Sequence, residues 1–217
     1  HIRTGSFQRA ATLGDDVLLH ALVGYSLQRL YDTEPGEQAP AQLLGQVVER
    51  TADLAASYMI AGFVHGVLNS DNINITGESF DYGPWRFTPE WTPGFTAAYF
   101  DHQGLYAFGR QAEAIHWDVA QLAIALRQIS EVEPLIAELE RFADHYGSAM
   151  QRRFFWRLGL VPGDDDTAAR ALMEASVRAM MESGTQIDRF FFDWRGGTLL
   201  NPVAKSHYAN DIWATVR

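Results

Sequence analysis

The sequence contains no cysteine and only one lysine, Lys205, among its 217 residues. The absence of cysteine excludes disulfide bonds, thiolate metal sites and a cysteine nucleophile. No apolar run approaches the roughly 20 residues that a membrane-spanning helix needs, and the first residues lack the apolar segment of a signal peptide. We therefore expect no membrane partner. A chain without cysteine suits the reducing cytoplasm, which is the location we expect.

Positive charge is also scarce. The 17 Lys and Arg residues stand against 27 Asp and Glu residues, which gives a formal net charge of −10. A uniformly basic surface for DNA or RNA is excluded, so we expect no nucleic-acid partner. A local basic site for a nucleotide is compatible with this charge. The 47% of hydrophobic residues is typical of a globular protein with a packed core.

Apolar periodicity predicts a mainly helical chain. The expected helices cover about 15–31, 41–62, 111–129 and 132–158, with a break near Gly147 in the last of them, and a further helix begins at Asp164, Asp165 and Asp166. This acidic cluster suits the positive end of a helix dipole, with a cation site as the alternative. Residues 73–75 and 78–80 are expected to form a small β-hairpin, 88–109 a long aromatic loop and 198–217 an irregular tail.

The strongest candidate site combines HGVLNSDN at residues 65–72 with DYG at residues 81–83. Two acids and an amide lie in two loops that the predicted hairpin joins. Mg²⁺ prefers oxygen ligands, typically one or two carboxylates with phosphate oxygens and water. Phosphate chemistry also needs a side chain that orients the attacking hydroxyl. Ordinary turn residues are the alternative, but both loops in this order, between a long helix and an aromatic loop, favour a metal–phosphate site.

Several motifs that recur in order carry a resemblance to a known family. HGVLNSDN, ITGESFDYGPWRF, WTPGF and DHQGLYAFGRQ resemble segments of the selenoprotein O family, an atypical branch of the protein-kinase fold, and the opening HIRTGSFQ resembles another. The match is specific over roughly residues 1–111. In the predicted helices that follow, it rests mainly on the pattern of apolar residues. The resemblance implies a mainly α, kinase-like C-terminal lobe over 1–217, with a small β-hairpin that carries the metal-binding turn.

The resemblance also implies a role for each of four residues. Asp71 occupies the catalytic-base position, Asn72 and Asp81 hold Mg²⁺ or Mn²⁺, and Arg3 reaches the phosphates of ATP. Members of the family bind ATP in a flipped orientation, transfer AMP to Ser, Thr or Tyr hydroxyls of proteins and release pyrophosphate. The implied cofactors are therefore ATP and a divalent metal, and the implied partners are ATP and protein substrates.

The sequence departs from the family's pattern at several points. Leu105 replaces a usual Arg, and Arg86 replaces a usual Gly. The glycine-rich loop, strand lysine and partner glutamate of a complete enzyme are absent, so we expect a fragment of a longer chain that is inactive by itself. Two alternatives stay open: a kinase for a protein or small molecule, and a catalytically inactive pseudokinase lobe that acts as a binding or structural module.

Three other features have competing interpretations. We expect His65 to hold the loop at residues 65–72, called the catalytic loop below for its expected role, through backbone hydrogen bonds rather than to transfer a proton. Asp118 either anchors that loop from the following helix or is a solvated helix residue. An aromatic cluster either binds a substrate segment or pins the long loop onto the core; its members are Trp85, Phe87, Trp91, Phe95, Tyr99 and Phe100.

Overall fold

The computed structural model describes residues 1–162 and 165–217 and is mainly helical. Its helices are α1 (Thr4–Thr12), α2 (Asp16–Leu30), α3 (Ala39–Ala61), α4 (Gln111–Leu126), α5 (Val132–Glu140), α6 (Phe142–Leu158), α7 (Asp166–Ser183), α8 (Ile187–Asp193) and α9 (Pro202–His207). The strands β1 (Phe63–Val64) and β2 (Arg86–Phe87) form one antiparallel pair, and 3₁₀ turns cover Phe108–Arg110 and Asp211–Trp213.

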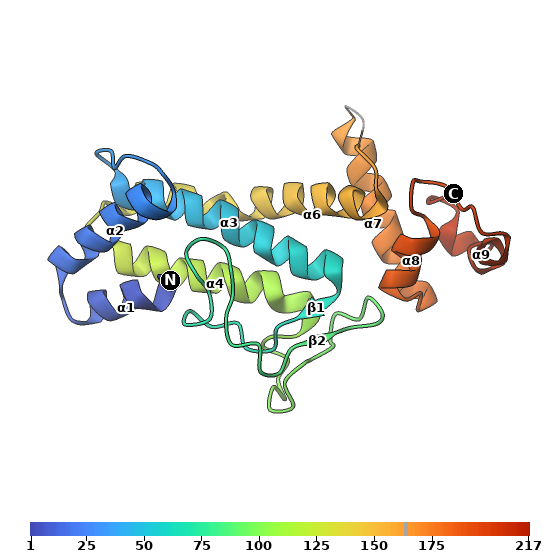
Figure 1. Ribbon diagram of the computed structural model, residues 1–217, viewed down its shortest axis with the longest axis horizontal. Coiled ribbons are helices and arrows are strands. Elements are labelled where there is room, and N and C mark those ends of the chain that lie inside the picture. Colours follow the sequence, from blue (N-terminus) through green and yellow to red (C-terminus); the bar gives the residue numbers. More distant parts are fainter. Residues whose placement is uncertain (163–164) are drawn as a thin grey trace.

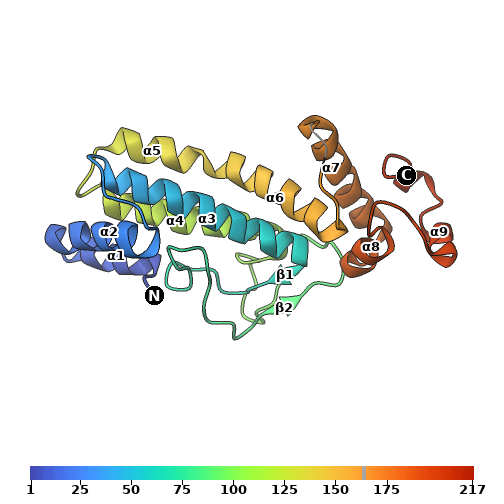
Figure 2. The ribbon, with the colours of Figure 1, turned by 45° about the horizontal axis from the view of Figure 1, so that its top comes forward.

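Helix α3 is the centre of the fold. It packs against α4, α5 and α6, which run alongside it, while α1 and α2 lie at one end and α7, α8 and α9 at the other (Figures 1 and 2). Its apolar residues are buried on several faces, so it contributes to both hydrophobic clusters of the molecule. Pro40 lies in its first turn, and Gly62 ends it with a left-handed φ of 71°.

The structure confirms three of the long helices that apolar periodicity predicts. Periodicity did not predict the shorter elements α1, β1 and β2. The expected helices over 15–31, 41–62 and 111–129 correspond to α2, α3 and α4 to within a few residues. Helix α1 was not predicted, because only Thr4, Phe7 and Ala10 of its nine residues are buried. The pair of β1 and β2 also escaped prediction, since two residues are too few to show an alternating pattern.

The expected break near Gly147 is wrong. Helix α5 ends at Glu140 and α6 begins at Phe142, so the break is at Arg141 and Gly147 lies inside α6. Glycine disfavours a helix interior by about 1 kcal/mol. Burial of Phe142 and Met150 on either side outweighs that preference, since α6 packs along α3.

The acidic cluster begins α7, as expected. The side chain of Asp165 accepts a hydrogen bond from the backbone N–H of Ala168 at 3.0 Å, and Asp166 lies in the first turn. This is the geometry of an N-cap, which supplies an acceptor to a backbone donor that has no partner within the helix. The third member, Asp164, lies outside the described residues.

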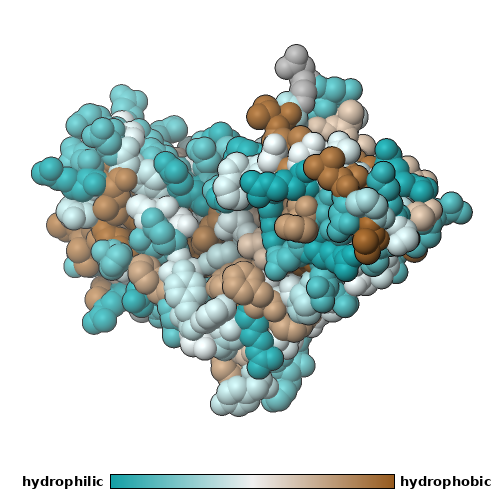
Figure 3. Space-filling model, turned by 45° about the vertical axis from the view of Figure 1, so that its right-hand side comes forward, coloured by the Kyte–Doolittle hydropathy of each residue, from teal (hydrophilic) through white to brown (hydrophobic). Residues whose placement is uncertain are grey.

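The segment 198–217, expected to be an irregular tail, contains α9 and the 3₁₀ turn at Asp211–Trp213. Ala204, Tyr208 and Trp213 are fully buried in the second hydrophobic cluster. The hydroxyl of Tyr208 donates to the carboxylate of Asp193 at 3.0 Å. The segment is therefore packed onto α7 and α8, and small apolar patches remain exposed on this side of the molecule (Figure 3).

No helix among the described residues is long and apolar enough to cross a membrane.

Candidate functional site

The two candidate loops are joined by a minimal hairpin rather than by two strands. Ile73 and Ser79 form an isolated antiparallel bridge, and the backbone N–H of Phe80 donates to the carbonyl of Asn72 at 2.9 Å. This bond places Asn72 beside the residue that precedes Asp81. The expected hairpin is therefore present as a bridge, and it brings the two expected metal ligands to the same edge.

The N-terminal segment extends this hairpin on its other side. Arg3 and Asn74 form an antiparallel bridge, and the N–H of Thr4 donates to the carbonyl of Ile73 at 3.1 Å. The guanidinium of Arg3 lies over the ring of Phe80, with its central carbon 4.9 Å from the ring centroid. Such a cation–π contact contributes about 0.5–1 kcal/mol at an exposed site. Arg3, far away in sequence, thus lies next to the turn that carries Asp81.

Asn72 is buried and oriented by the catalytic loop. Its side-chain nitrogen donates to the carbonyl of Val67 at 3.0 Å, and its backbone N–H donates to the carbonyl of Asn69 at 2.8 Å. Because the amide nitrogen is engaged, the orientation leaves Oδ1 as the atom that could accept a cation.

Asp81 has an unusual backbone conformation. Its φ is 59°, and Asp32 is the other residue besides glycine with a positive φ among the described residues. An L-residue in this region is strained by about 1–2 kcal/mol, less for Asp than for most. Such strain is concentrated at functional sites, where the surrounding structure maintains it. The exposed carboxylate of Asp81 forms no hydrogen bond with any described residue.

Asp71 lies against the first turn of α1. Thr4 donates from its hydroxyl, and Gly5 from its backbone N–H, to the carbonyl of Ser70, at 2.6 Å and 3.0 Å. The backbone N–H of Asp71 is bound by the side chain of Asn69 at 3.1 Å. The carboxylate of Asp71 fills the space that a side chain at position 5 would need. Helix α1 therefore positions the expected catalytic base.

Replacement of Gly5 by alanine is expected to lower the activity of the full-length protein without unfolding it. The added Cβ overlaps Oδ1 of Asp71, so the carboxylate must move. A displacement of about 1 Å can reduce the rate about 100-fold, whereas alanine is a better helix former than glycine. Labelled-nucleotide transfer and urea unfolding measure the two effects. Gly24→Ala is the matched control, because a Cβ at Gly24 of α2 meets only open space; equal activity losses in both variants would contradict this account.

His65 connects the catalytic loop to the turn that carries Asp81. Its Nε2 lies 2.7 Å from the carbonyl of Phe80, and its Nδ1 accepts from the N–H of Val67 at 3.3 Å. This network assigns the proton to Nε2. Burial lowers the pKa of His65, while the bond to Phe80 and the charge of Asp81 oppose that effect. Both ring nitrogens are occupied, which agrees with the structural role expected for His65.

Gln111 was not recognised as a site residue from the sequence. It is fully buried at the start of α4, where its Oε1 accepts from the N–H of His65 at 3.0 Å and its Nε2 donates to the carbonyl of Phe63 at 2.8 Å. The amide thus completes the hydrogen bonds of the segment that leads into the catalytic loop. The one signal in the sequence was its place at the end of the DHQGLYAFGRQ segment.

Asp118 is fully buried, so its interpretation as a solvated helix residue is wrong. Neither carboxylate oxygen has a hydrogen-bond partner among the described residues, so no bond to the catalytic loop is formed either. Burial, and then the negative charge of Asp71, raises the pKa of Asp118 to about 8. The raised pKa therefore favours the protonated, neutral carboxyl in the folded protein at neutral pH.

Replacement of Asp118 by asparagine is expected to stabilise the protein by an amount that grows as the pH rises from about 4 to 8. The folded-state pKa of Asp118 lies above its ordinary value of 3.8, so the folded state binds the extra proton and stability falls as pH rises from about 4 to 8. Asparagine cannot ionise, and we expect its advantage to reach about 1–3 kcal/mol above pH 8. Urea unfolding of both proteins across this range measures the difference. A difference independent of pH would contradict the assignment.

The residues that could hold a metal are few. Among residues 1–162 and 165–217, no three or more His, Cys, Asp or Glu side chains converge on a possible metal position. Asn72 and Asp81 offer one amide oxygen and one carboxylate, which is the small protein share that Mg²⁺ takes when phosphates and water supply its other ligands. The pair fits a nucleotide-bound metal and not an all-protein cage.

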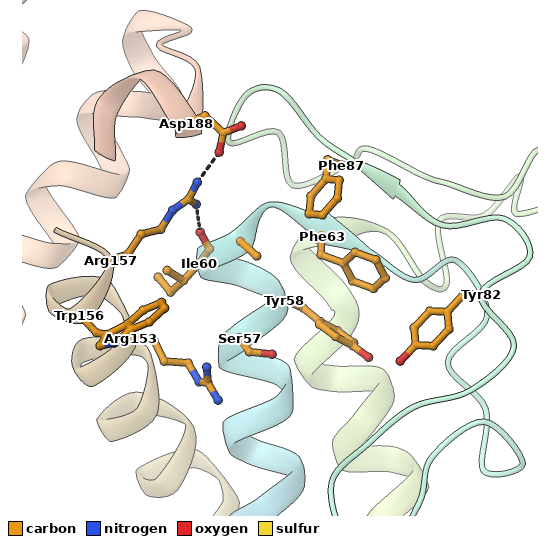
Figure 4. Close-up of a pocket in the computed structure, with 11 residues that line it drawn as sticks. Ser57, Tyr58, Ile60, Phe63, Tyr82, Phe87, Arg153, Trp156, Arg157 and Asp188 are labelled. Atoms are coloured by element: carbon orange, nitrogen blue, oxygen red, sulfur yellow. Dashed lines mark hydrogen bonds and ion pairs between the residues drawn. The ribbon is translucent and has the colours of Figure 1, made fainter. Parts of the chain in front are cut away.

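A cavity of about 660 Å³ lies behind this site, between α3, α6 and the loop around Tyr82 (Figure 4). Arg157 donates to the carbonyl of Ile60 and to Asp188 at its edge, so its charge is already paired. Tyr82, which packs on His65 with ring centroids 5.2 Å apart, is the link to the candidate site. None of the four expected site residues lines the cavity.

The aromatic cluster of the long loop divides into two groups. Trp91 is 6% exposed and packs on Phe108 with ring centroids 5.5 Å apart, so it pins the loop to the core as expected. Tyr99 is 88% exposed and is free to contact a partner. The long loop reaches Gly66, where an added Cβ would lie 3.1 Å from the Cβ of Ala97.

Comparison with known proteins identifies similar sequences. The model of a family described as protein adenylyltransferase SelO matches residues 1–205. A protein nucleotidyltransferase YdiU from Synechococcus sp. is 42% identical over 164 residues, which cover 73% of this chain and 32% of that protein. Proteins of the same description from Trichormus variabilis and Hahella chejuensis are 33% and 35% identical, over 89% and 88% of this chain and 40% and 39% of their own. The chain spans about a third to two fifths of these relatives.

Proposed function

Because the chain belongs to the protein adenylyltransferase SelO family, we propose that the whole protein transfers AMP from ATP to Ser, Thr or Tyr hydroxyls of other proteins. The observation that carries this proposal is the hydrogen bond from Phe80 to Asn72, which joins the two candidate loops. It brings the backbone of Asn72 beside that of Phe80, the residue before Asp81, and Asp71 directly precedes Asn72 in the chain. That combination is suited to phosphate chemistry on a hydroxyl acceptor.

Each residue of the site has a proposed task. Asn72 Oδ1 and the carboxylate of Asp81 hold Mg²⁺ or Mn²⁺, which supplies positive charge to the phosphate oxygens when it is bound. Arg3, held over Phe80, adds a fixed positive charge toward the departing pyrophosphate. Asp71 accepts the proton of the attacking hydroxyl or orients it. The raised pKa of the buried Asp118 favours its neutral form, which limits the negative charge that it adds to that of Asp71.

The proposal also covers the fold of this region and the cellular location of the reaction. We assign the helices and the two loops to the C-terminal lobe of a kinase-like fold, in a protein whose remaining part supplies further nucleotide contacts. The small two-stranded sheet and the central α3 support this assignment. We place the reaction in the cytoplasm, as the sequence led us to expect.

The test is to incubate the full-length protein with Mg²⁺, candidate protein acceptors and ATP that is labelled on either the α- or the γ-phosphate. Transfer from the α-phosphate alone is the expected result. Transfer from the γ-phosphate would identify a kinase instead. No transfer from either, with folding intact, would favour a binding or structural module.

A further inference from the structure

A second pocket lies beside the catalytic loop and shares no lining residue with the Tyr82 cavity. It has a volume of about 260 Å³ and is lined by Leu68 of the catalytic loop, Leu105 and Tyr106 of the aromatic loop, and Ala114 and Trp117 of α4. The lining is predominantly apolar, and Leu105 and Trp117 are 49% and 58% exposed. Exposed apolar surface gathered in a concave site is typical of a place where a partner binds.

The pocket is close to the proposed chemistry. Leu68 precedes Asp71 by three residues in the same loop. Leu68 itself lines the pocket, so the loop that carries the expected catalytic base also forms part of the pocket wall.

The wall made by the aromatic loop is held in place before any partner binds. The carboxylate of Asp101 accepts hydrogen bonds from the backbone N–H groups of Leu105 and Tyr106, each at 2.8 Å. Both donors belong to residues that line the pocket. A partner that enters it therefore avoids much of the entropic cost of ordering a loop.

The charges at the rim compensate each other. Arg110 and Glu113 form a two-pronged ion pair, with two N···O distances of 3.0 Å. The pair leaves the pocket lining without net charge, which together with the apolar walls suits a neutral, apolar group. Leu105, which is half exposed, strengthens this apolar character.

We infer that this pocket binds an apolar side chain of the acceptor protein, close in sequence to the residue whose hydroxyl is modified. The inference rests on the proposed function, since it names the feature by which the acceptor polypeptide is recognised. An exposed tryptophan beside a small pocket is the kind of residue that dominates binding at protein interfaces. Leu105 and Trp117 then determine acceptor specificity, while Asp71 acts on the hydroxyl.

Peptides test this inference with the full-length protein. Each carries one Ser, Thr or Tyr, with Leu, Phe, Gly or Asp placed in turn at each flanking position, and labelling from α-labelled ATP is measured as kcat/KM. We expect at least about tenfold preference for Leu or Phe over Asp at one position. Trp117→Ala should reduce that preference to about twofold, and Leu105→Arg should reverse it toward Asp. Peptides with Gly at that position should be labelled equally by all forms.

Trp156→Ala is the matched control, because Trp156 on α6 is 76% exposed and lies outside the pocket. An unchanged preference in Trp117→Ala, or an equal loss in Trp156→Ala, would overturn the inference.

Binding of the same peptides, measured by fluorescence anisotropy, tests the pocket independently of the proposed function. If the wild type labels no peptide, the proposed function fails. Tenfold weaker binding of Leu peptides by Trp117→Ala would then still support the pocket, and equal binding would overturn it.

A photo-crosslinking group at position 105 identifies the occupant. Crosslinks to the acceptor peptide are expected. Crosslinks confined to another segment of the same full-length chain would show that the pocket is covered internally, and would overturn the inference.

Discussion

Replacement of Asp81 by alanine or by glycine is expected to abolish nucleotide transfer, but the glycine variant should be the more stable of the two. Both changes remove the carboxylate that we assign to the metal, and we expect the rate to fall by about 1000-fold or more. Alanine keeps a Cβ at a φ of 59°, whereas glycine adopts this conformation without strain. The glycine variant should therefore exceed the alanine variant by about 1 kcal/mol in free energy of unfolding.

Asp32 provides the matched control for this experiment. It has a φ of 50° and is exposed in the loop after α2. Asp32→Gly should exceed Asp32→Ala in stability by a similar amount, and both should transfer nucleotide at the wild-type rate. Urea unfolding and labelled-ATP assays of the full-length protein measure the two quantities. Retained transfer in either Asp81 variant would contradict the assigned role of this carboxylate.

Replacement of Asp71 by asparagine is expected to lower the rate of transfer while leaving nucleotide binding intact. An amide has nearly the same shape as the carboxylate but cannot accept the proton of the attacking hydroxyl. General-base catalysis contributes about 100- to 10,000-fold, so we expect kcat to fall within that range. The affinity for Mg-ATP, measured by calorimetry, should be unchanged, because the metal is assigned to Asn72 and Asp81.

Ser70→Ala is the control within the same loop, since the Ser70 hydroxyl forms no hydrogen bond with any described residue and its backbone carbonyl makes the contacts to α1. It should retain the wild-type rate. If Asp71→Asn and Ser70→Ala lower kcat equally, or if Asp71→Asn weakens Mg-ATP binding as much as it lowers the rate, Asp71 serves to hold the loop and not to accept the proton.

The sequence predicts those parts of the fold that local physics determines. Helices α2, α3 and α4 have sustained apolar periodicity, and the capping position of Asp165 follows from the helix dipole. The break at Arg141 and the packing of Tyr208 and Trp213 could not be predicted, because contacts between distant elements decide them. In each of these cases tertiary burial outweighs a local preference.

The candidate site likewise has parts that the sequence predicts and parts that depend on tertiary contacts. Asp71, Asn72, Asp81 and Arg3 could be named through a family resemblance, but nothing local in the sequence places Arg3 over Phe80. The burial of Asp118 and the hydrogen bonds of Gln111 could not be predicted from the sequence, because both depend on the packing of α4. Asp118 looks like any surface acid of a helix until α4 is packed, and Gln111 reveals its role only when its amide meets the backbone of His65.

The position of the metal tests the central claim most directly. Crystals of the full-length protein grown with Mn²⁺ and a non-hydrolysable ATP analogue would reveal the ion through its anomalous scattering. We predict a peak at bonding distance from Asn72 Oδ1 and from the carboxylate of Asp81, next to the nucleotide phosphates, which is absent from crystals of Asp81→Ala. An anomalous peak next to other residues, or nucleotide phosphates bound away from these two loops, would contradict the account.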